Sequence, residues 1–281
     1  MNELIKEIRR LSGYTQEKMA EYMGTSPITV SRWENDKVIP NNMAQIKLYD
    51  LCQKKELDLS DFLIENNKSD EKDVLYHASR KGIKGSIQPI SRDKCDFGKG
   101  FYMGDNILQP LTLVCNEKDP VFYTLKFFAY DFNIIDIKVD LDWAMLIAYY
   151  RGYMDEYKDT RIYKKYAHFT DGYDAIIGYI ADDRIYAVMT DFFEGRITDE
   201  ALIACLSALK LGRQCVCLDQ KACDRLVILK EKKLSRLELL LLGDISEKRR
   251  KEGISLTRKY LNEYRRVGYY FDEIIEGKNH G

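Results

Sequence analysis

Three short amphipathic helices separated by glycines open the chain, and this pattern limits the fold more than any other stretch. Gly13 and Gly24 are expected to end the first two helices, and Ser26 followed by Pro27 is typical of the start of the third. The apolar residues that recur at helical spacing are Leu4, Ile5, Ile8, Leu11, Met19, Ala20, Tyr22, Val30 and Trp33. A helix, a glycine-containing turn and a second helix form the helix-turn-helix layout, whose second helix enters the major groove of DNA.

The outward-facing residues of this motif are candidates for DNA contact. The segment GYTQEKMAEYMGTSPITVSRWENDKVIP resembles the Xre/Cro-repressor family of helix-turn-helix domains. The resemblance implies that Gln16 bonds a phosphate and that Ser26 and Thr29 contact the DNA backbone or bases. It also implies that Ile28 and Arg32 reach base edges, where Arg32 can bond a guanine through two hydrogen bonds. The expected partner is a double-stranded DNA operator, bound by a homodimer on paired half-sites.

Charge leaves a second interpretation of this domain open. The formal net charge of the chain is -1, which excludes a uniformly basic nucleic-acid-binding protein but not a local basic patch. Phosphate binding is strengthened by an excess of basic residues, whereas the numbers of basic and acidic residues in this domain are close to equal. A helix-turn-helix used only for dimerisation or protein contact is therefore the alternative. Asp36 stands where the family usually has Gly, a change that Asp tolerates because it can adopt the left-handed conformation.

The chain divides into two domains, a linker and a tail. The segment IENNKSDEKD has no apolar periodicity and is rich in turn-forming and charged residues, as expected of a linker. We place the helix-turn-helix domain at residues 1–64, the linker at 65–73, the second domain at 74–228 and a helical tail at 229–281. Strands outnumber long helices in the second domain and do not alternate regularly with them, which predicts an α+β fold.

Composition and cysteine usage bear on the compartment. The N-terminal segment lacks the apolar core of a signal peptide, and no apolar run is long enough to span a membrane. The 7 cysteines are odd in number and none lies in a CxxC pair, which favours reduced thiols. Cys215 and Cys217 share one face of a predicted strand with no His nearby, so we expect a buried strand there and no metal. A soluble cytoplasmic protein without membrane association is expected.

The glycine-rich stretch DFGKGFYMGDN is the first candidate for chemistry in the second domain, because glycines allow tight turns and close approach of a ligand. It is not part of a protein kinase, since no Gly-rich loop, VAIK or HRD precedes it. It also matches neither a P-loop nor GxGxxG. The segments LYHAS, DFGKGFYMG, LDWAMLIAYYRG, YDAIIGYIADDRIY and GRQCVCLD resemble, in order and spacing, a bacterial family of unknown function, DUF3990. That family is similar to the ADP-ribosyltransferases, which implies two small sheets around a cleft for NAD.

The resemblance implies a catalytic set. Related enzymes with a His-Tyr-Glu signature match His77 and Tyr102 here, but Gln214 stands at the third position. Breaking the nicotinamide–ribose bond develops an oxocarbenium-like sugar, and Gln can bond a ribose hydroxyl but cannot supply negative charge. Three accounts stay open: catalysis with Gln214 as a weaker third group, substitution by a nearby acid, or nucleotide binding without turnover. The candidate acids are Asp182, Asp183, Glu194 and Asp219.

The same resemblance implies how NAD would be held. Tyr102 would stack on the nicotinamide ring, and His77 would bond the ribose hydroxyls on the adenosine side. The main chain around Ala78 would hold the carboxamide. The remaining implied contacts are walls from Phe97 and Phe101 and backbone clearance from Gly98 and Gly100.

Two function hypotheses follow. The first is a DNA-binding protein with an NAD-using ADP-ribosyltransferase domain, acting as a toxin or defence component that represses its own operon. It would have an ADP-ribose acceptor that the sequence does not identify and a partner protein from the same operon. The second is a transcription regulator whose second domain only senses NAD, ADP-ribose or a related nucleotide. The tail, with LSRLELLLLGDI and ISLTRKYLNEYRRVGYYFDEII as predicted helices, would supply a dimer contact or cover the second domain.

Overall fold

The computed structural model describes residues 1–181, 183–209, 212–264 and 266–278. Its N-terminal domain is helical, with α1 (Asn2–Leu11), α2 (Gln16–Met23), α3 (Pro27–Glu34), α4 (Asn42–Lys54) and α5 (Ser60–Asn67). The Thr15 hydroxyl accepts a hydrogen bond from the Lys18 amide, and the Ser26 hydroxyl accepts one from the Thr29 amide. Gly24 ends α2 in the left-handed conformation. The predicted helix-turn-helix is therefore present, with α2 ending at Gly24 and α3 capped by Ser26 where the sequence predicted these ends.

The core of this domain agrees with the apolar spacing except at one position. Leu4, Ile8 and Val30 are buried, but Leu11 is 39% exposed because α1 ends there. Asp36 has a φ of 55°, so it does adopt the left-handed conformation in place of the family's Gly.

The second domain is built on one seven-stranded sheet. Its strands are β1 (Val74–Ser79), β2 (Phe101–Gly104), β3 (Val121–Phe127), β4 (Ile134–Asp136), β5 (Ala175–Tyr179), β6 (Arg213–Cys217) and β7 (Leu226–Lys233), in the order β4-β5-β6-β2-β1-β3-β7. The β4–β5 pair is parallel, and the other neighbours are antiparallel.

In place of the expected two small sheets there is one seven-stranded sheet, whose two halves, β4-β5-β6-β2 and β1-β3-β7, join between β2 and β1. Only Tyr76 and Gly104 are in register between β1 and β2, so the halves meet at a single pair. The side chains between the halves form one apolar cluster that includes Phe101, Tyr123 and Cys217. Core side chains therefore pack against the sheet near the junction of its two halves.

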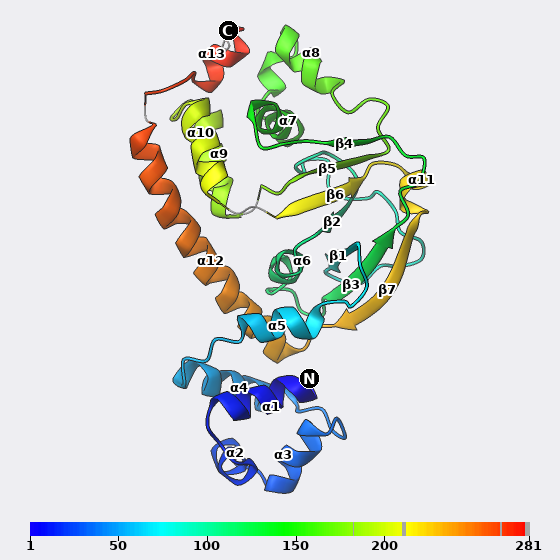
Figure 1. The fold of residues 1–281 in the computed structure, drawn as a ribbon, viewed down its shortest axis with the longest axis vertical. Coiled ribbons are helices and arrows are strands. Elements are labelled where there is room, and N and C mark those ends of the chain that lie inside the picture. The colour runs from blue at the N-terminus through cyan, green and yellow to red at the C-terminus, as the bar shows by residue number, and fades with distance from the viewer. Residues whose placement is uncertain (182, 210–211, 265, 279–281) are drawn as a thin grey trace.

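Helices cover the outer face of the β4-β5-β6-β2 half (Figure 1). The helices of this domain and the tail are α6 (Leu108–Leu113), α7 (Leu141–Arg151), the 3-10 helix η1 (Asp155–Tyr157), α8 (Arg161–Ala167), α9 (Asp183–Phe193), α10 (Asp199–Ala208), α11 (Gln220–Cys223), α12 (Arg236–Glu263) and α13 (Phe271–Ile275). Asp140 caps α7 by accepting from the Trp143 amide at 2.9 Å. Trp143 is fully buried and its indole donates to the Tyr179 carbonyl at 3.1 Å, which locks α7 against β5.

The tail differs from the prediction at both ends. The predicted boundary at residue 228 falls inside β7, an edge strand that pairs with β3, so the sheet of the second domain extends past that boundary. The two predicted tail helices are one 28-residue helix, α12, followed after a break by the short α13. A capping box between Ser235 and Glu238 starts α12. None of the described helices is long and apolar enough to cross a bilayer.

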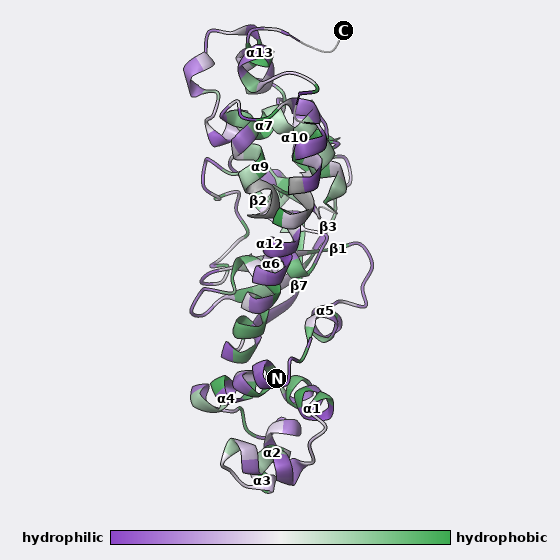
Figure 2. Ribbon diagram, turned by 90° about the vertical axis from the view of Figure 1, so that its left-hand side faces the viewer, coloured by the Kyte–Doolittle hydropathy of each residue, from purple (hydrophilic) through white to green (hydrophobic). Residues whose placement is uncertain are grey.

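Helix α12 ties the two domains together. It runs from the helix-turn-helix domain along the second domain, and Figure 2 shows that domain at the opposite end of the molecule from α13. The Asp244 carboxylate accepts from the Tyr49 hydroxyl at 2.9 Å and from the Gln53 amide at 2.5 Å. Burial and the hydrogen bond to Asp244 raise the pKa of Tyr49 to about 12, so its hydroxyl keeps the proton it donates. Four residues on, Lys248 pairs with Asp58 at 3.1 Å.

The linker is shorter than predicted. Residues 65–67 form the last turn of α5, and Asn67 is buried. Its side-chain oxygen accepts from Lys232 at 2.7 Å, and Lys232 also pairs with the buried Glu238 at 2.6 Å. Burial opposes ionisation of Glu238, but Lys232 and Ser235 outweigh it and hold the pKa of Glu238 below its usual value. The end of α5 is therefore fixed to the second domain rather than flexibly tethered.

Candidate functional site

The exposed face of α3 brings the predicted DNA-binding residues together. Gln16, Ile28 and Arg32 line one surface groove with Ser31 and Lys37. Ile28 is 67% exposed, and Arg32 is exposed on the same helix. The face carries the cations Arg32 and Lys37.

The other predicted DNA-binding residues hold the motif in place as well. Ser26 is the N-cap of α3, and its hydroxyl lies 3.0 Å from that of Thr29. The Gln16 amide donates to the buried Glu34 carboxylate at 2.6 Å, and Arg9 pairs with the same carboxylate. The side chain of Gln16 is therefore fixed by Glu34 beside the groove.

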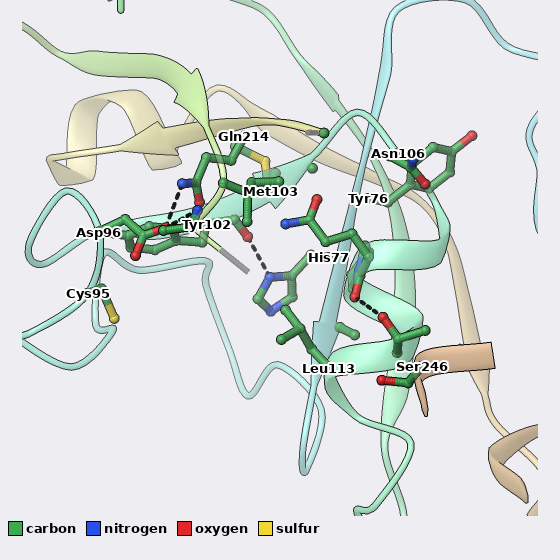
Figure 3. A pocket seen from close by; sticks show the side chains of 18 of the residues that line it. Tyr76, His77, Cys95, Asp96, Tyr102, Met103, Asn106, Leu113, Gln214 and Ser246 are labelled. Atoms are coloured by element: carbon green, nitrogen blue, oxygen red, sulfur yellow. Dashed lines mark hydrogen bonds between the residues drawn. The ribbon is translucent and has the colours of Figure 1, made fainter. Parts of the chain in front are cut away.

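A cavity of about 840 Å³ lies over the junction of β1 and β2. Its floor is strand residues, one wall is α6, and another wall is α12. Of the residues predicted to act, it brings together His77, Ala78, Tyr102 and Gln214, which come from three strands far apart in the sequence. Figure 3 shows His77 near the middle, with Asp96 and Gln214 on one side and Ser246 on the other.

His77 is held at the point where the two halves of the sheet separate. Its Nδ1 lies 2.7 Å from the Tyr102 carbonyl oxygen, and its ring packs against Phe101 at a centroid distance of 4.5 Å. Burial lowers the pKa of His77, so the neutral ring donates from Nδ1 to the carbonyl and keeps Nε2 as an acceptor. An acceptor nitrogen suits a ribose hydroxyl donor.

The depressed pKa of His77 predicts a pH dependence of stability. Below pH 6.5 the unfolded chain binds a proton at this position that the folded chain does not, so the free energy of unfolding should fall as pH drops through this range. The slope should be up to about 1.4 kcal/mol per pH unit. Urea unfolding at pH 7.5 and 5.5 should show a smaller loss in His77→Gln than in the wild type. The exposed His168→Gln is the matched control, and equal losses in all three proteins would contradict the assignment.

Tyr102 lines the cavity, and its hydroxyl is held by the loop before β2. Its hydroxyl donates to the Gly98 carbonyl at 2.7 Å and accepts from the Phe97 amide at 3.0 Å. Burial raises the pKa of Tyr102, so it stays protonated. With both functions of the hydroxyl satisfied, the ring is fixed in orientation and can stack on a planar group.

Gln214 belongs to a buried polar network. Its amide nitrogen donates to the Asp96 carboxylate and to the Tyr179 carbonyl, both at 3.0 Å. Arg151 pairs with Asp96 at 2.5 Å, and the Ala181 amide donates to the same carboxylate at 3.1 Å. The position where a catalytic carboxylate was expected therefore holds the amide of Gln214, which lies within hydrogen-bond distance of the Asp96 carboxylate.

Charge in the cavity favours an anionic ligand. Asp96 is the sole acid among its described lining residues, and Arg151 pairs with it. The cations that line the cavity are Arg92, Lys94, Arg151, Arg249 and Arg250. Oε1 of Gln109 on α6 is buried without a hydrogen-bond partner in the described part of the chain. Buried acceptors are nearly always bonded, so this oxygen fits a donor from a bound molecule.

Four of the residues expected to contact NAD lie outside the cavity lining. Phe97 and Phe101 are buried in apolar clusters of the domain. A Cβ on Gly98 would lie 2.6 Å from the Tyr150 ring, and one on Gly100 would lie 2.5 Å from Val216. The glycines thus give clearance to the protein's own side chains, not to the cavity.

Two of the candidate acids from the sequence, Glu194 and Asp219, lie outside the lining of the cavity. Glu194 is exposed and pairs with Arg196, and Asp219 is an exposed N-cap of α11. Asp182 and the side chain of Asp183 lie outside the described part. Asp96 was missed, although an acid placed directly between Cys95 and Phe97 in a predicted turn was a signal that it could be buried.

Sequence reasoning also missed two other contributors to the cavity. Arg151 ends α7, where a basic residue is ordinary, and nothing local marked it as a partner of Asp96. Helix α12 contributes Arg249 and Arg250, which lie in the charged stretch EKRRKEG, and Ser246, which directly precedes it. A stretch with this composition is also typical of a solvent-exposed helix face. Nothing in the local sequence distinguishes a charged residue that lines a cavity from one on a solvent-exposed helix face.

The cysteine pair behaves as a core element. Cys215 and Cys217 are buried on the inner side of β6, beside Cys223. Hydrogen bonding to Cys215 and Cys223, together with burial, raises the pKa of the Cys217 thiol. Among the described residues, no group of three or more His, Cys, Asp or Glu is placed to hold a metal ion.

Comparisons with known proteins match both parts of the chain. A family model described as a protein of unknown function, DUF3990, matches residues 74–228. A helix-turn-helix family model matches residues 5–44. No curated protein and no solved structure matches the chain. The helix-turn-helix match supports a DNA-binding regulator, and the cavity is centred on the domain of unknown function.

Proposed function

The chain belongs to the DUF3990 family through residues 74–228, and from this premise we propose that it is a DNA-binding protein whose family domain binds NAD and transfers ADP-ribose from it. One observation carries the proposal. The cavity brings His77, Tyr102 and Gln214, separated by up to 137 positions in the sequence (77 to 214), to a single site with excess positive charge.

The parts of NAD have counterparts in this cavity. Its planar nicotinamide would stack on the fixed ring of Tyr102. A ribose hydroxyl would donate to Nε2 of His77, and the pyrophosphate would be neutralised by the lining cations. A volume of about 840 Å³ lies within the usual range for sites that enclose a small ligand.

The reaction needs negative charge near the ribose. The bond between nicotinamide and ribose C1′ breaks, its electron pair leaves with neutral nicotinamide, and positive charge develops on the sugar. An acceptor nucleophile or water then bonds C1′ and loses a proton. We assign the stabilising charge to Asp96, whose carboxylate also orients Gln214. Arg151 holds that carboxylate in place and partly offsets its charge.

Release of nicotinamide from NAD by the purified full-length protein tests the proposal. Tyr102→Ala removes the stacking surface and the hydroxyl that fixes the Phe97–Gly98 turn, so kcat/KM should fall by about tenfold or more. Tyr130→Ala, at a tyrosine that is 72% exposed and outside the cavity lining, is the matched control. Wild-type turnover in Tyr102→Ala, or no release and no ADP-ribose transfer by the wild type, would contradict the enzyme assignment.

A second candidate function is favoured by α12. This helix contributes Ser246, Arg249 and Arg250 to the cavity and, through Asp244 and Lys248, contacts the helix-turn-helix domain. A ligand that moved α12 would change the position of that domain, and coupling between two sites is reciprocal. In this case the protein senses NAD or a related nucleotide without turnover. Tight NAD binding that shifts operator affinity, with no nicotinamide released, would identify this function.

A further inference from the structure

One wall of the cavity comes from outside the family domain. The family match ends at residue 228, whereas Ser246, Arg249 and Arg250 lie on α12, after the last strand. Figure 3 shows Ser246 on the far side of His77 from Asp96 and Gln214. The cavity therefore has one end formed by the family domain and another end formed by the added helix.

The three α12 residues occupy one face of a well-anchored helix. Arg249 and Arg250 follow Ser246 by three and four positions, so both side chains lie on the same side of the helix as Ser246. The helix is fixed near its start by the Ser235–Glu238 capping box and by the fully buried Leu237. Side chains on such a helix keep their spacing when a ligand binds.

The chemistry of these residues suits a phosphate. Arginine bonds phosphate oxygens through a planar fork of N–H donors, and two successive arginines with a nearby hydroxyl can serve a pyrophosphate. Ser246 lies away from Asp96, the acid of the described lining (Figure 3). A phosphate of the DNA backbone is a poorer occupant, because α3 lies at the end of the helix-turn-helix domain far from α12 (Figure 1).

We propose that Ser246, Arg249 and Arg250 form a phosphate subsite of the cavity that takes the pyrophosphate of a bound dinucleotide. The identity of the ligand rests on the proposed function, but the anion chemistry of the subsite does not. The dinucleotide then spans the cavity, with its nicotinamide end beside Tyr102 and its phosphates against α12. The subsite also makes α12, and not only the family domain, part of ligand recognition.

Calorimetric titration of the full-length protein with ADP-ribose and, separately, with inorganic pyrophosphate tests the subsite. In Arg249→Ala/Arg250→Ala the dissociation constants of both probes should rise by about tenfold or more, and binding should weaken with added salt less steeply than in the wild type. Lys251→Ala is the matched control, because it removes a cation from the same helix. Lys251 pairs with Glu247 and does not line the cavity. Its affinities should equal those of the wild type. If the alanine variant unfolds, Arg249→Gln/Arg250→Gln keeps polar side chains and serves instead.

The outcomes separate the subsite from the proposed function. Equal ADP-ribose affinity in the wild type and the arginine variant would overturn the subsite and leave NAD binding intact. Arginine-dependent binding of pyrophosphate without binding of ADP-ribose would support the subsite and overturn NAD as the ligand. Failure of the wild type to bind either probe would overturn both.

Discussion

Replacing Asp96 with Asn is expected to slow nicotinamide release by about a hundredfold to a thousandfold, the usual loss when one preorganised electrostatic group is removed from an active site. The carboxylate lies 3.0 Å from the Gln214 amide in the cavity, and it is the acid that the described lining offers. Asn keeps the size of the side chain but loses the charge that would face a developing oxocarbenium. The fall should be in kcat rather than in KM, because that charge develops only in the transition state.

The same change also affects stability, and a paired variant separates the two effects. Asp96→Asn leaves the half-buried Arg151 without its carboxylate but with its hydrogen bond to the Ala181 carbonyl, which should cost about 1–3 kcal/mol in the free energy of unfolding. Asp96→Asn/Arg151→Gln removes both charges and should recover part of that loss, as measured by urea unfolding. The double variant should still be slow. Wild-type turnover in a folded double variant would show that Asp96 is not the group that stabilises the sugar.

Replacing Arg32 with Ala is expected to weaken binding to the preferred DNA sequence by about tenfold to a hundredfold, because a bidentate contact to guanine is worth about 1–3 kcal/mol of discrimination. Arg32 is exposed on α3 and shares a groove with Gln16 and Ile28. The preferred sequence can be selected from a random DNA library with the wild-type full-length protein. The variant should lose preference at one base position per half-site while its non-specific affinity changes little.

Arg10→Ala is the matched control for this measurement. Arg10 is an exposed arginine of the same domain, but it lies on α1 and pairs with Glu7 at 2.6 Å. Its loss should leave both the affinity and the base preference unchanged. An unaltered base preference in Arg32→Ala would contradict the assignment of α3 as the recognition helix, and would favour the use of this domain for protein contact.

The sequence predicted the helix-turn-helix well because its determinants are local. Caps at Thr15 and Ser26 and the left-handed turn at Gly24 lie within a few residues of the helices they define. The edge strand β7 was missed for the opposite reason. It is a run of apolar residues followed by LKEKK, and Val227 and Leu229 are 46% and 41% exposed, so no alternation marks a buried face. Its place depends on pairing with β3, about a hundred positions earlier, and charged residues are common on such edges.

The site shows the same division between local and distant information. His77, Tyr102 and Gln214 were singled out through the resemblance to the His-Tyr-Glu enzymes, and they do line one cavity. The roles of Phe97 and Gly98 could not be inferred, since whether a side chain faces a ligand or the core depends on how α7 packs over the loop. The contributions of Arg151 and α12 depend on tertiary contacts alone.

Determination of the structure of the full-length protein with bound NAD tests the central claim most directly. The account predicts nicotinamide stacked on the ring of Tyr102, a ribose hydroxyl bonded to His77, and Asp96 and Gln214 beside the bond to be broken. The pyrophosphate should lie against α12 at Arg249 and Arg250. NAD bound elsewhere on the protein, or no binding at saturating concentration, would contradict the assignment of this cavity as the NAD site.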